Sequence, residues 1–220
     1  MVRRFTSLGL VLAAIGAVFV VMGFFGLRQV EAGQRSLVAF SKAQDVNLTY
    51  DDNGNLVDRG TTDGADAIKE LLTEDWKYAA KKSELDPNDP LVDTATEYMY
   101  QMATIAYHTL NGTQTVMLDK DVESGGQTYK AGTYEFDVDG RYWTDFDRQD
   151  PIQAKAREQA WGTANSLIAN LGVGAVTAST LQLGTAVSLM ILAVGAAFLV
   201  LGGGLIWALR GQAPEVTFGA

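Results

Sequence analysis

Three pairs of aspartates have the spacing most suggestive of chemistry. They are Asp119 and Asp121, Asp137 and Asp139, and Asp145 and Asp147. Residues two apart in a strand point to the same face of a sheet, so each pair would present two carboxylates together. Calcium takes roughly six to eight oxygen ligands, which converging pairs could supply, and paired carboxylates also serve glycoside hydrolysis. Three interpretations stay open: a solvated acidic face, a calcium or other cation site, and a hydrolase.

The residue types that most catalytic sites require are scarce. The chain has one histidine, His108, and no cysteine. Without cysteine, the chain forms no disulfide and no thiolate metal site. One histidine cannot supply a facial-triad iron site or a typical catalytic zinc site. No Gly-x-Ser-x-Gly turn, phosphate loop or dinucleotide fingerprint occurs. We therefore expect no enzyme and no catalytic or cofactor-binding residues, with His108 as a structural side chain.

Charge is distributed unevenly along the chain. The net charge is −9, but between Arg28 and Val187 there are 25 acidic and 14 basic residues, a balance of −11. An acidic region of this kind repels nucleic acid, so no nucleic-acid partner is expected. A cationic partner or solvated cations suit it better.

Two long apolar runs contain no charged residue. Leu8 to Leu27 is 20 residues long and Ser188 to Leu209 is 22 residues long. At about 1.5 Å per residue, each helix would cross a hydrocarbon layer of roughly 30 Å. The sequence therefore predicts transmembrane helices over 8–27 and 188–209, with the lipid bilayer as a partner. A cleaved signal peptide is the alternative for the first run, but its apolar core is long and Arg28 follows it directly.

Arginines at the two ends of the chain indicate an orientation. Arg3 and Arg4 precede the first run and Arg210 closes the second. Positive residues favour the cytoplasmic side, so residues 1–7 and 210–220 are expected in the cytoplasm. This places the protein in the plasma membrane with its acidic central domain outside the cytoplasm.

Small residues recur every seven positions in both apolar runs. They are Gly9, Gly16 and Gly23 in the first, and Ser188, Gly195 and Gly202 in the second. A seven-residue repeat keeps one stripe facing a partner helix, and small side chains let backbones approach closely in lipid. We expect an antiparallel hairpin packed along these stripes. The alternative is that glycine is simply common in membrane helices.

Between the runs, helical arms are expected to flank a small α+β domain. The arms are 28–44 and 151–187, which could form a two-helix stalk, unless Gly172 and Gly174 break the second arm. The domain is 45–150, with a hairpin at Asn53-Gly54.

Within this domain, caps and alternation predict the elements. Asp63 is expected to cap a helix running to about Lys82, and Asp89 to cap one that begins at Pro90 and ends near Leu110. A β region should cover Gln114 to Asp147. Asp150-Pro151 should open the last arm, with Gln153 completing a capping box.

The order of several short motifs resembles a known group. The motifs are the turn Asp86–Pro90, Ala106–Leu110, Tyr142–Phe146, Asp150-Pro151 and Ala208–Gly211. Between Asp86 and Gly211 the chain resembles a loose group of actinobacterial two-pass membrane proteins of unknown function. Some members carry a ring-opening dioxygenase label, and the single histidine here argues against that chemistry.

Taken together, these features favour a non-catalytic protein of the cell envelope. It would act as an accessory subunit or scaffold, through its outer domain, toward another membrane or envelope protein or a second copy of itself. The alternatives are a cation- or ligand-binding sensor module and an envelope hydrolase that uses the paired aspartates.

Overall fold

The computed structural model describes residues 2–210, with side chains from residue 5 onward, and divides the chain into two compact units. The helix-pair unit comprises Met1–Ser36 and Ser179–Ala220, and the α+β unit comprises Leu37–Ala178. Two long helices contribute to both: α1 (Val2–Gln44) and α4 (Pro151–Arg210). Beyond Arg210, the predicted cytoplasmic tail lies outside the described residues.

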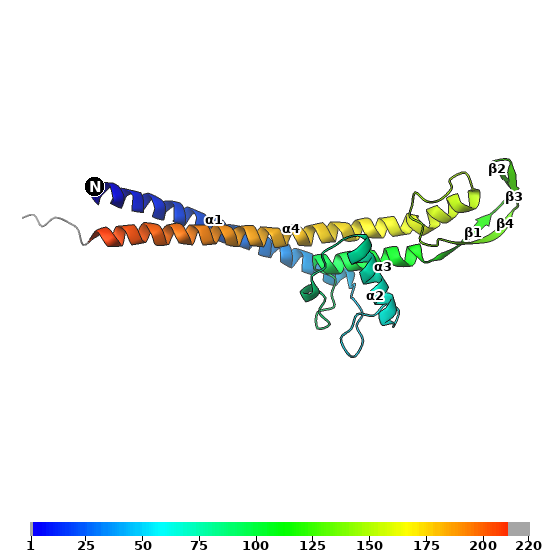
Figure 1. The fold of residues 1–220 in the computed structure, drawn as a ribbon, viewed down its shortest axis with the longest axis horizontal. Coiled ribbons are helices and arrows are strands. Elements are labelled where there is room, and N and C mark those ends of the chain that lie inside the picture. The colour runs from blue at the N-terminus through cyan, green and yellow to red at the C-terminus, as the bar shows by residue number, and fades with distance from the viewer. Residues whose placement is uncertain (1, 211–220) are drawn as a thin grey trace, which may run out of the picture. The chain divides into compact units, whose positions relative to one another are not determined.

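In the helix-pair unit, α1 and α4 run side by side in opposite directions (Figure 1). Gly9, near the start of α1, lies against Gly202, near the end of α4, whereas Gly33 lies against Leu181. The rings of Phe19 and Phe198 meet between them, with centroids 6.3 Å apart. The antiparallel order is therefore set along the whole length of this unit.

Both long helices are apolar enough and long enough to cross a membrane, by length and composition. Only 17% of the most apolar window of α1 and 11% of that of α4 is buried inside the chain. Phe25, Val200 and Trp207 are among the large apolar side chains left exposed. Exposed apolar surface of this extent is compatible with a helix pair that is surrounded by lipid.

The α+β unit is built around the helix α3 (Ala95–Leu110). It packs against α2 (Thr62–Glu70) and the π-helical turn η1 (Leu71–Asp75) that continues α2. A 3-10 turn, η2 (Lys82–Glu84), precedes it. Apolar side chains of these helices, of the first turns of α4 and of the strand and loop segments between them fill the core, which includes Leu48, Ile68, Leu72, Ala103, Val116, Val138, Phe146 and Ala156.

Four short strands form two antiparallel ladders. β1 (Thr113–Leu118) pairs with β4 (Gly132–Asp137), so that Thr113 lies opposite Asp137. Between them, β2 (Val122–Ser124) and β3 (Gln127–Tyr129) form a hairpin. Its turn is Gly125-Gly126, with φ of 58° and 79°, a conformation that favours glycine at both positions.

The first helix of the α+β unit differs from its prediction. Its cap is Thr61 rather than Asp63: the Thr61 side chain accepts the Gly64 N–H, and the helix begins at Thr62. The helical segment ends near Trp76 rather than Lys82. The next residue, Lys77, has a φ of 53°, which lies outside the α-helical range.

The second helix begins later than predicted. Residues near Pro90 are extended instead, because the Pro90 carbonyl accepts the Leu48 N–H and the Val92 N–H donates to Val46. The helix starts only at Ala95, where Thr94 and Glu97 form a capping box. The prediction that this helix begins at Pro90 was therefore wrong, because a long-range backbone pairing holds that proline outside the helix.

At the start of α4, Asp150 caps the helix as expected, accepting from the N–H groups of Ile152 and Gln153. The Gln153 side chain does not complete the box. It accepts from the Asp147 N–H instead and so holds the preceding loop. Gly172 and Gly174 do not break the second arm, which was the alternative to a continuous helix, because α4 is helical from Pro151 to Arg210.

Candidate functional site

The first aspartate pair lies on a turn and not on a strand as predicted. Asp119 and Asp121 follow the end of β1 at Leu118, where the chain turns toward β2. Asp121 accepts from the Lys130 ammonium at 2.8 Å and from the Ala131 N–H at 2.8 Å. These two hydrogen bonds lower the pKa of Asp121. Asp121 therefore links the start of β2 to the end of β3.

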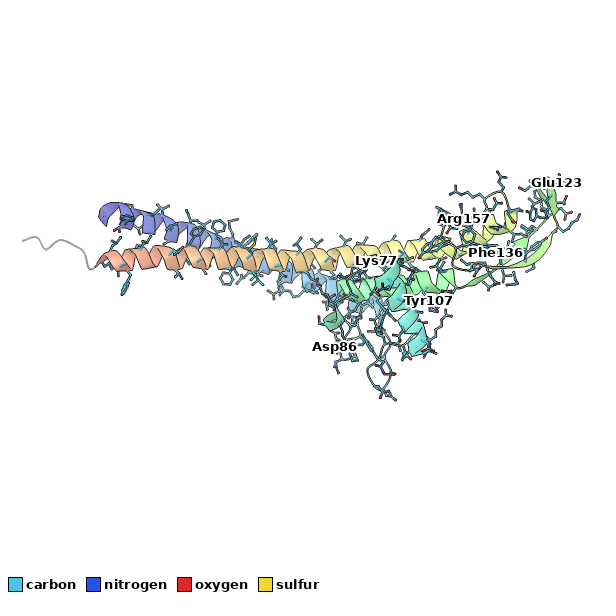
Figure 2. The ribbon with its side chains drawn as sticks, in the orientation of Figure 1. Lys77, Asp86, Tyr107, Glu123, Phe136 and Arg157 are labelled. Atoms are coloured by element: carbon cyan, nitrogen blue, oxygen red, sulfur yellow. The ribbon has the colours of Figure 1, made fainter. Side chains whose placement is uncertain are left out.

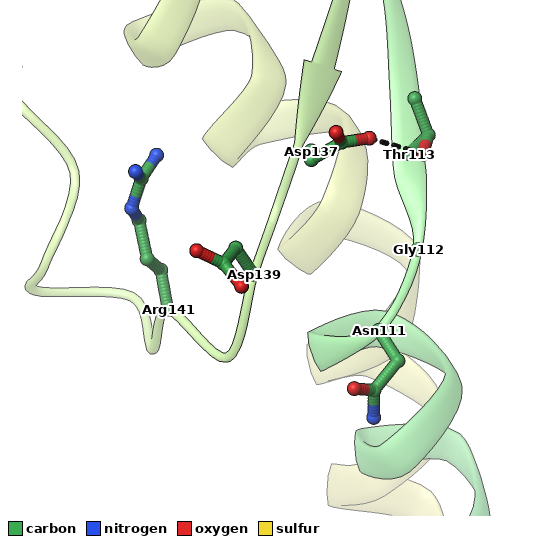
Figure 3. Close-up of a pocket in the computed structure, with 6 residues that line it drawn as sticks. All are labelled: Asn111, Gly112, Thr113, Asp137, Asp139 and Arg141. Carbon is green, nitrogen blue, oxygen red and sulfur yellow. Dashed lines mark hydrogen bonds between the residues drawn. The ribbon is translucent and has the colours of Figure 1, made fainter.

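The second pair lies at the edge of a shallow hollow (Figure 3). Asp137 is the last residue of β4 and accepts from the Thr113 hydroxyl at 2.5 Å. Asp139 lies just beyond the strand, with a φ of 51°. The hollow is also lined by Asn111 and Arg141.

The third pair was predicted on a strand, but β4 ends at Asp137 and the chain turns instead. Asp145 accepts from the Tyr142 N–H, and Asp147 accepts from the Gln149 N–H. Each carboxylate thus bonds to a backbone amide two or three residues away, which holds a turn rather than a strand. Among residues 2–210, no three acidic, histidine or cysteine side chains are grouped as metal ligands would be.

The glycines of the two apolar runs lie at the contact between α1 and α4. A Cβ placed on Gly16 would lie 2.7 Å from the Gly195 carbonyl oxygen, and one on Gly202 would lie 2.5 Å from the Gly9 carbonyl oxygen. Real side chains do not approach backbone so closely. These four positions therefore bring the two backbones into direct contact.

The pairing departs from strict register at the other end of the stripes. Gly23 lies against Leu192, with the leucine Cγ 2.6 Å from the position of an added Cβ, whereas Ser188 lies against Gly26. Straight α-helices drift by about 20° per seven residues relative to a seven-residue repeat. Because of this drift, Gly26 lies opposite Ser188 in place of Gly23, which is three residues earlier in α1.

His108 has a partner that sequence spacing did not indicate. Its Nε2 atom lies 3.0 Å from the Asp58 carboxylate, and both side chains are largely covered. Asp58 is 50 residues away in the chain, on the loop that precedes α2. The pair ties this loop to the C-terminal part of α3.

Two tyrosine hydroxyls near this pair are buried without a hydrogen-bond partner, those of Tyr50 and Tyr100. Burial, reinforced by the charges of Glu97 and Asp86, raises the pKa of Tyr50 to about 12. Burial and the nearby Asp58 charge also raise the pKa of Tyr100. Both phenols therefore stay protonated at physiological pH and cannot act as bases.

A search of family models, curated proteins and solved structures found no match. Function must therefore be inferred from the geometry of this chain alone.

Buried carboxylates gather at the N-terminus of α3. Glu97 accepts from the N–H groups of Asp93 and Thr94 and from the Thr94 hydroxyl, the last at 2.7 Å. Glu84 accepts from the Thr96 N–H at 3.0 Å. The Thr-x-x-Glu spacing that signals such a box is visible in the sequence, but the prediction placed the cap at Asp89 instead.

Burial raises the pKa of Glu97 and that of Asp93, although the hydrogen bonds to Glu97 oppose the effect. The folded state therefore holds protons more tightly than the unfolded chain. The stabilisation that these two carboxyl groups give the folded state is complete below their pKa in the unfolded chain. It is lost as the pH rises through their pKa in the folded state.

We expect Glu97→Gln to gain stability relative to the wild type as the pH rises from about 4 to 7. Glutamine can still accept the three hydrogen bonds but carries no buried charge. The free energy of unfolding, measured at a series of pH values, checks this, with the exposed Glu158→Gln as the matched control. A Glu97→Gln chain whose advantage shrinks as the pH rises contradicts the assignment.

Proposed function

We propose that this chain is a two-span integral membrane protein of the cell envelope. In this proposal, it holds an acidic α+β unit outside the cytoplasm and acts as an accessory subunit or scaffold. The order of its short motifs, which resembles that of a loose group of actinobacterial two-pass membrane proteins, agrees with this proposal.

The observation that carries the proposal is the pairing of two charge-free helical segments. Phe5 to Leu27 in α1 and Ser188 to Leu209 in α4 lack any charged residue. Their backbones meet at Gly16 and Gly195, while their large apolar side chains face outward. A helix pair surrounded by lipid is expected to have small residues at the contact between the helices and large apolar residues on its outer surface.

Charge supports the proposed orientation. Arg3 and Arg4 lie before one span and Arg210 after the other, which favours a cytoplasmic location for both ends. The region between Arg28 and Val187 has a balance of −11. With both ends in the cytoplasm and two spans between them, this acidic region would lie on the opposite side of the membrane.

The polar groups of the α+β unit support a binding role over a catalytic one. The single histidine bonds to Asp58 and links two elements, and the Glu97 carboxylate accepts from backbone at a helix start. The paired aspartates hold turns or strand ends. These groups stabilise the unit, and its acidic surface is the part available to a partner.

The absence of cysteine makes topology directly testable. Thr128→Cys, on the exposed strand β3, should react with a membrane-impermeant maleimide in intact cells. Gly211→Cys should react only after lysis, and the wild-type chain, which has no cysteine, should stay unlabelled. The reverse labelling pattern, or an intact mass that lacks the first apolar run, would overturn the proposal.

The scaffold role is tested separately, by purifying the full chain in mild detergent and measuring what accompanies it. A companion protein in fixed stoichiometry, or a defined oligomer of the chain, is the expected result. A monodisperse single chain from cells at native expression level contradicts the role and leaves the topology standing.

A further inference from the structure

Two consecutive aromatic residues, Tyr142 and Trp143, lie against a half-buried arginine and a buried tryptophan near the start of α4. Arg157 and Trp161 are one helical turn apart and thus share a face of α4. The Arg157 guanidinium carbon lies 4.1 Å from the centre of the Trp143 ring. The rings of Tyr142 and Trp161 are stacked, with centroids 6.0 Å apart and planes at 21°. Figure 2 labels Arg157 on α4.

Three N–H donors in this cluster are buried and have no hydrogen-bond partner among the residues that the structure describes. They are Nε and Nη1 of Arg157 and Nε1 of Trp161, whose side chain is only 5% exposed. A buried donor without an acceptor has lost its hydrogen bond to water and gained none in return, which is unfavourable. The closed arrangement therefore holds a free-energy cost that a bound acceptor oxygen would remove.

The donors define the chemistry of the group that would bind them. All three can only donate, so the ligand must offer acceptor oxygens. Two of the three donors belong to the Arg157 guanidinium, which is positively charged, so an anionic acceptor such as a carboxylate is favoured over a neutral one.

The covering residues add an apolar requirement. Tyr142 and Trp143 are 41% and 36% exposed, so one side of these rings remains available for stacking. We propose that Arg157 and Trp161 form the floor of a binding site for a small monocarboxylate with a flat apolar body, beneath the Tyr142-Trp143 segment.

The covering segment has the anchors that a movable cover needs. It begins at Gly140, which follows Asp139 in a second consecutive left-handed conformation, with φ of 73° and 51°. It ends at Phe146, which is buried against Phe136. The donors are covered while the segment lies down, so entry of the carboxylate requires the residues between these anchors to lift.

The probe for this site is 4-fluorobenzoate, observed by ¹⁹F NMR in the presence of the full chain in nonionic detergent. Its line should broaden in proportion to protein concentration, beyond the effect of empty micelles. The neutral isostere 4-fluorobenzamide and inorganic phosphate are the comparison ligands. Benzamide should bind at least tenfold more weakly, since it lacks the charge that Arg157 would pair with.

Two variants test the floor of the site. Trp161→Phe keeps the ring but removes the indole donor, and should weaken binding of 4-fluorobenzoate about fivefold. Arg157→Gln should weaken it more than tenfold. Arg148→Gln, an exposed arginine on the same loop, makes the same change in charge and should bind like the wild type.

Circular dichroism first establishes that each variant is folded; if Arg157→Gln is not, Trp161→Phe decides alone. Equal binding by the Trp161→Phe, Arg148→Gln and wild-type chains overturns the proposal. So does binding of benzamide as tight as that of benzoate, or no broadening beyond micelles with the wild type. None of these results bears on membrane topology, so the scaffold proposal stands or falls separately.

Discussion

Replacing Gly202 with leucine is expected to separate α1 from α4 in the helix-pair unit, whereas the same replacement at Gly203 should leave the pair intact. A Cβ on Gly202 would lie 2.5 Å from the Gly9 carbonyl oxygen and 2.6 Å from the Ala13 nitrogen. Both are backbone atoms and cannot rotate away. A Cβ on Gly203 would meet nothing within 4 Å.

The expected cost at Gly202 is about 3 kcal/mol or more, the upper end of overpacking effects, because relief requires the helices to move apart. The measurement uses cysteines introduced at Phe19 and Phe198, whose rings are 6.3 Å apart, in the otherwise cysteine-free chain. A short bifunctional thiol reagent should link them in membranes, and mass spectrometry of the linked peptides gives the yield.

Comparison of the two neighbouring glycines controls for composition, since both variants add one leucine to the same helix. Gly202→Leu should lose most of the cross-linking and Gly203→Leu should retain it. Equal yields in the two variants would show that the close approach of Gly9 and Gly202 does not hold the helices together.

Replacing Gly174 with alanine should destabilise the α+β unit, although alanine is the better helix former. A Cβ there would overlap the ring of Tyr98, approaching its Cζ atom at 2.6 Å. Tyr98 is buried and its hydroxyl is hydrogen-bonded to Ser41 Oγ at 2.8 Å, so the ring has little room to move. We expect a net loss of about 1–3 kcal/mol.

The opposite sign is expected at Gly162 of the same helix. It is exposed, and an added Cβ would meet nothing within 4 Å. Helix propensity alone then acts, and Gly162→Ala should gain up to about 1 kcal/mol. Hydrogen exchange of the α3 amides, compared in the two variants, measures both effects in the unit concerned. Stabilisation by both alanines would show that Tyr98 does not pack closely against Gly174.

The two long helices could be predicted from the sequence because their signal is local. An unbroken run of about 20 apolar residues specifies a helix by itself, whatever the rest of the chain does. Asp150-Pro151 likewise marked the start of α4, because a cap acts on the N–H groups two and three residues ahead. The recurrence of glycine at seven-residue spacing was visible, but which glycine met which depended on the drift between two helices.

Errors arose where residues distant in the chain compete with a local signal. Pro90 is a good first helical residue, yet pairing of residues 90–92 with 46–48 keeps it extended. The aspartate pairs had the spacing of strand residues, but β1 ends at Leu118 and β4 at Asp137, so Asp121 and Asp147 lie outside the strands and their carboxylates accept from backbone N–H groups instead. A spacing of two residues carries no information about whether a partner strand is present.

By itself, the sequence determined the length and apolar character of the two long helices, the acidic balance between them and the lack of cysteine. Only the tertiary structure paired His108 with Asp58 and laid Trp143 over Arg157. The reason is physical: helix length and charge are sums over neighbouring residues, whereas a buried polar contact depends on where the fold brings separate segments together.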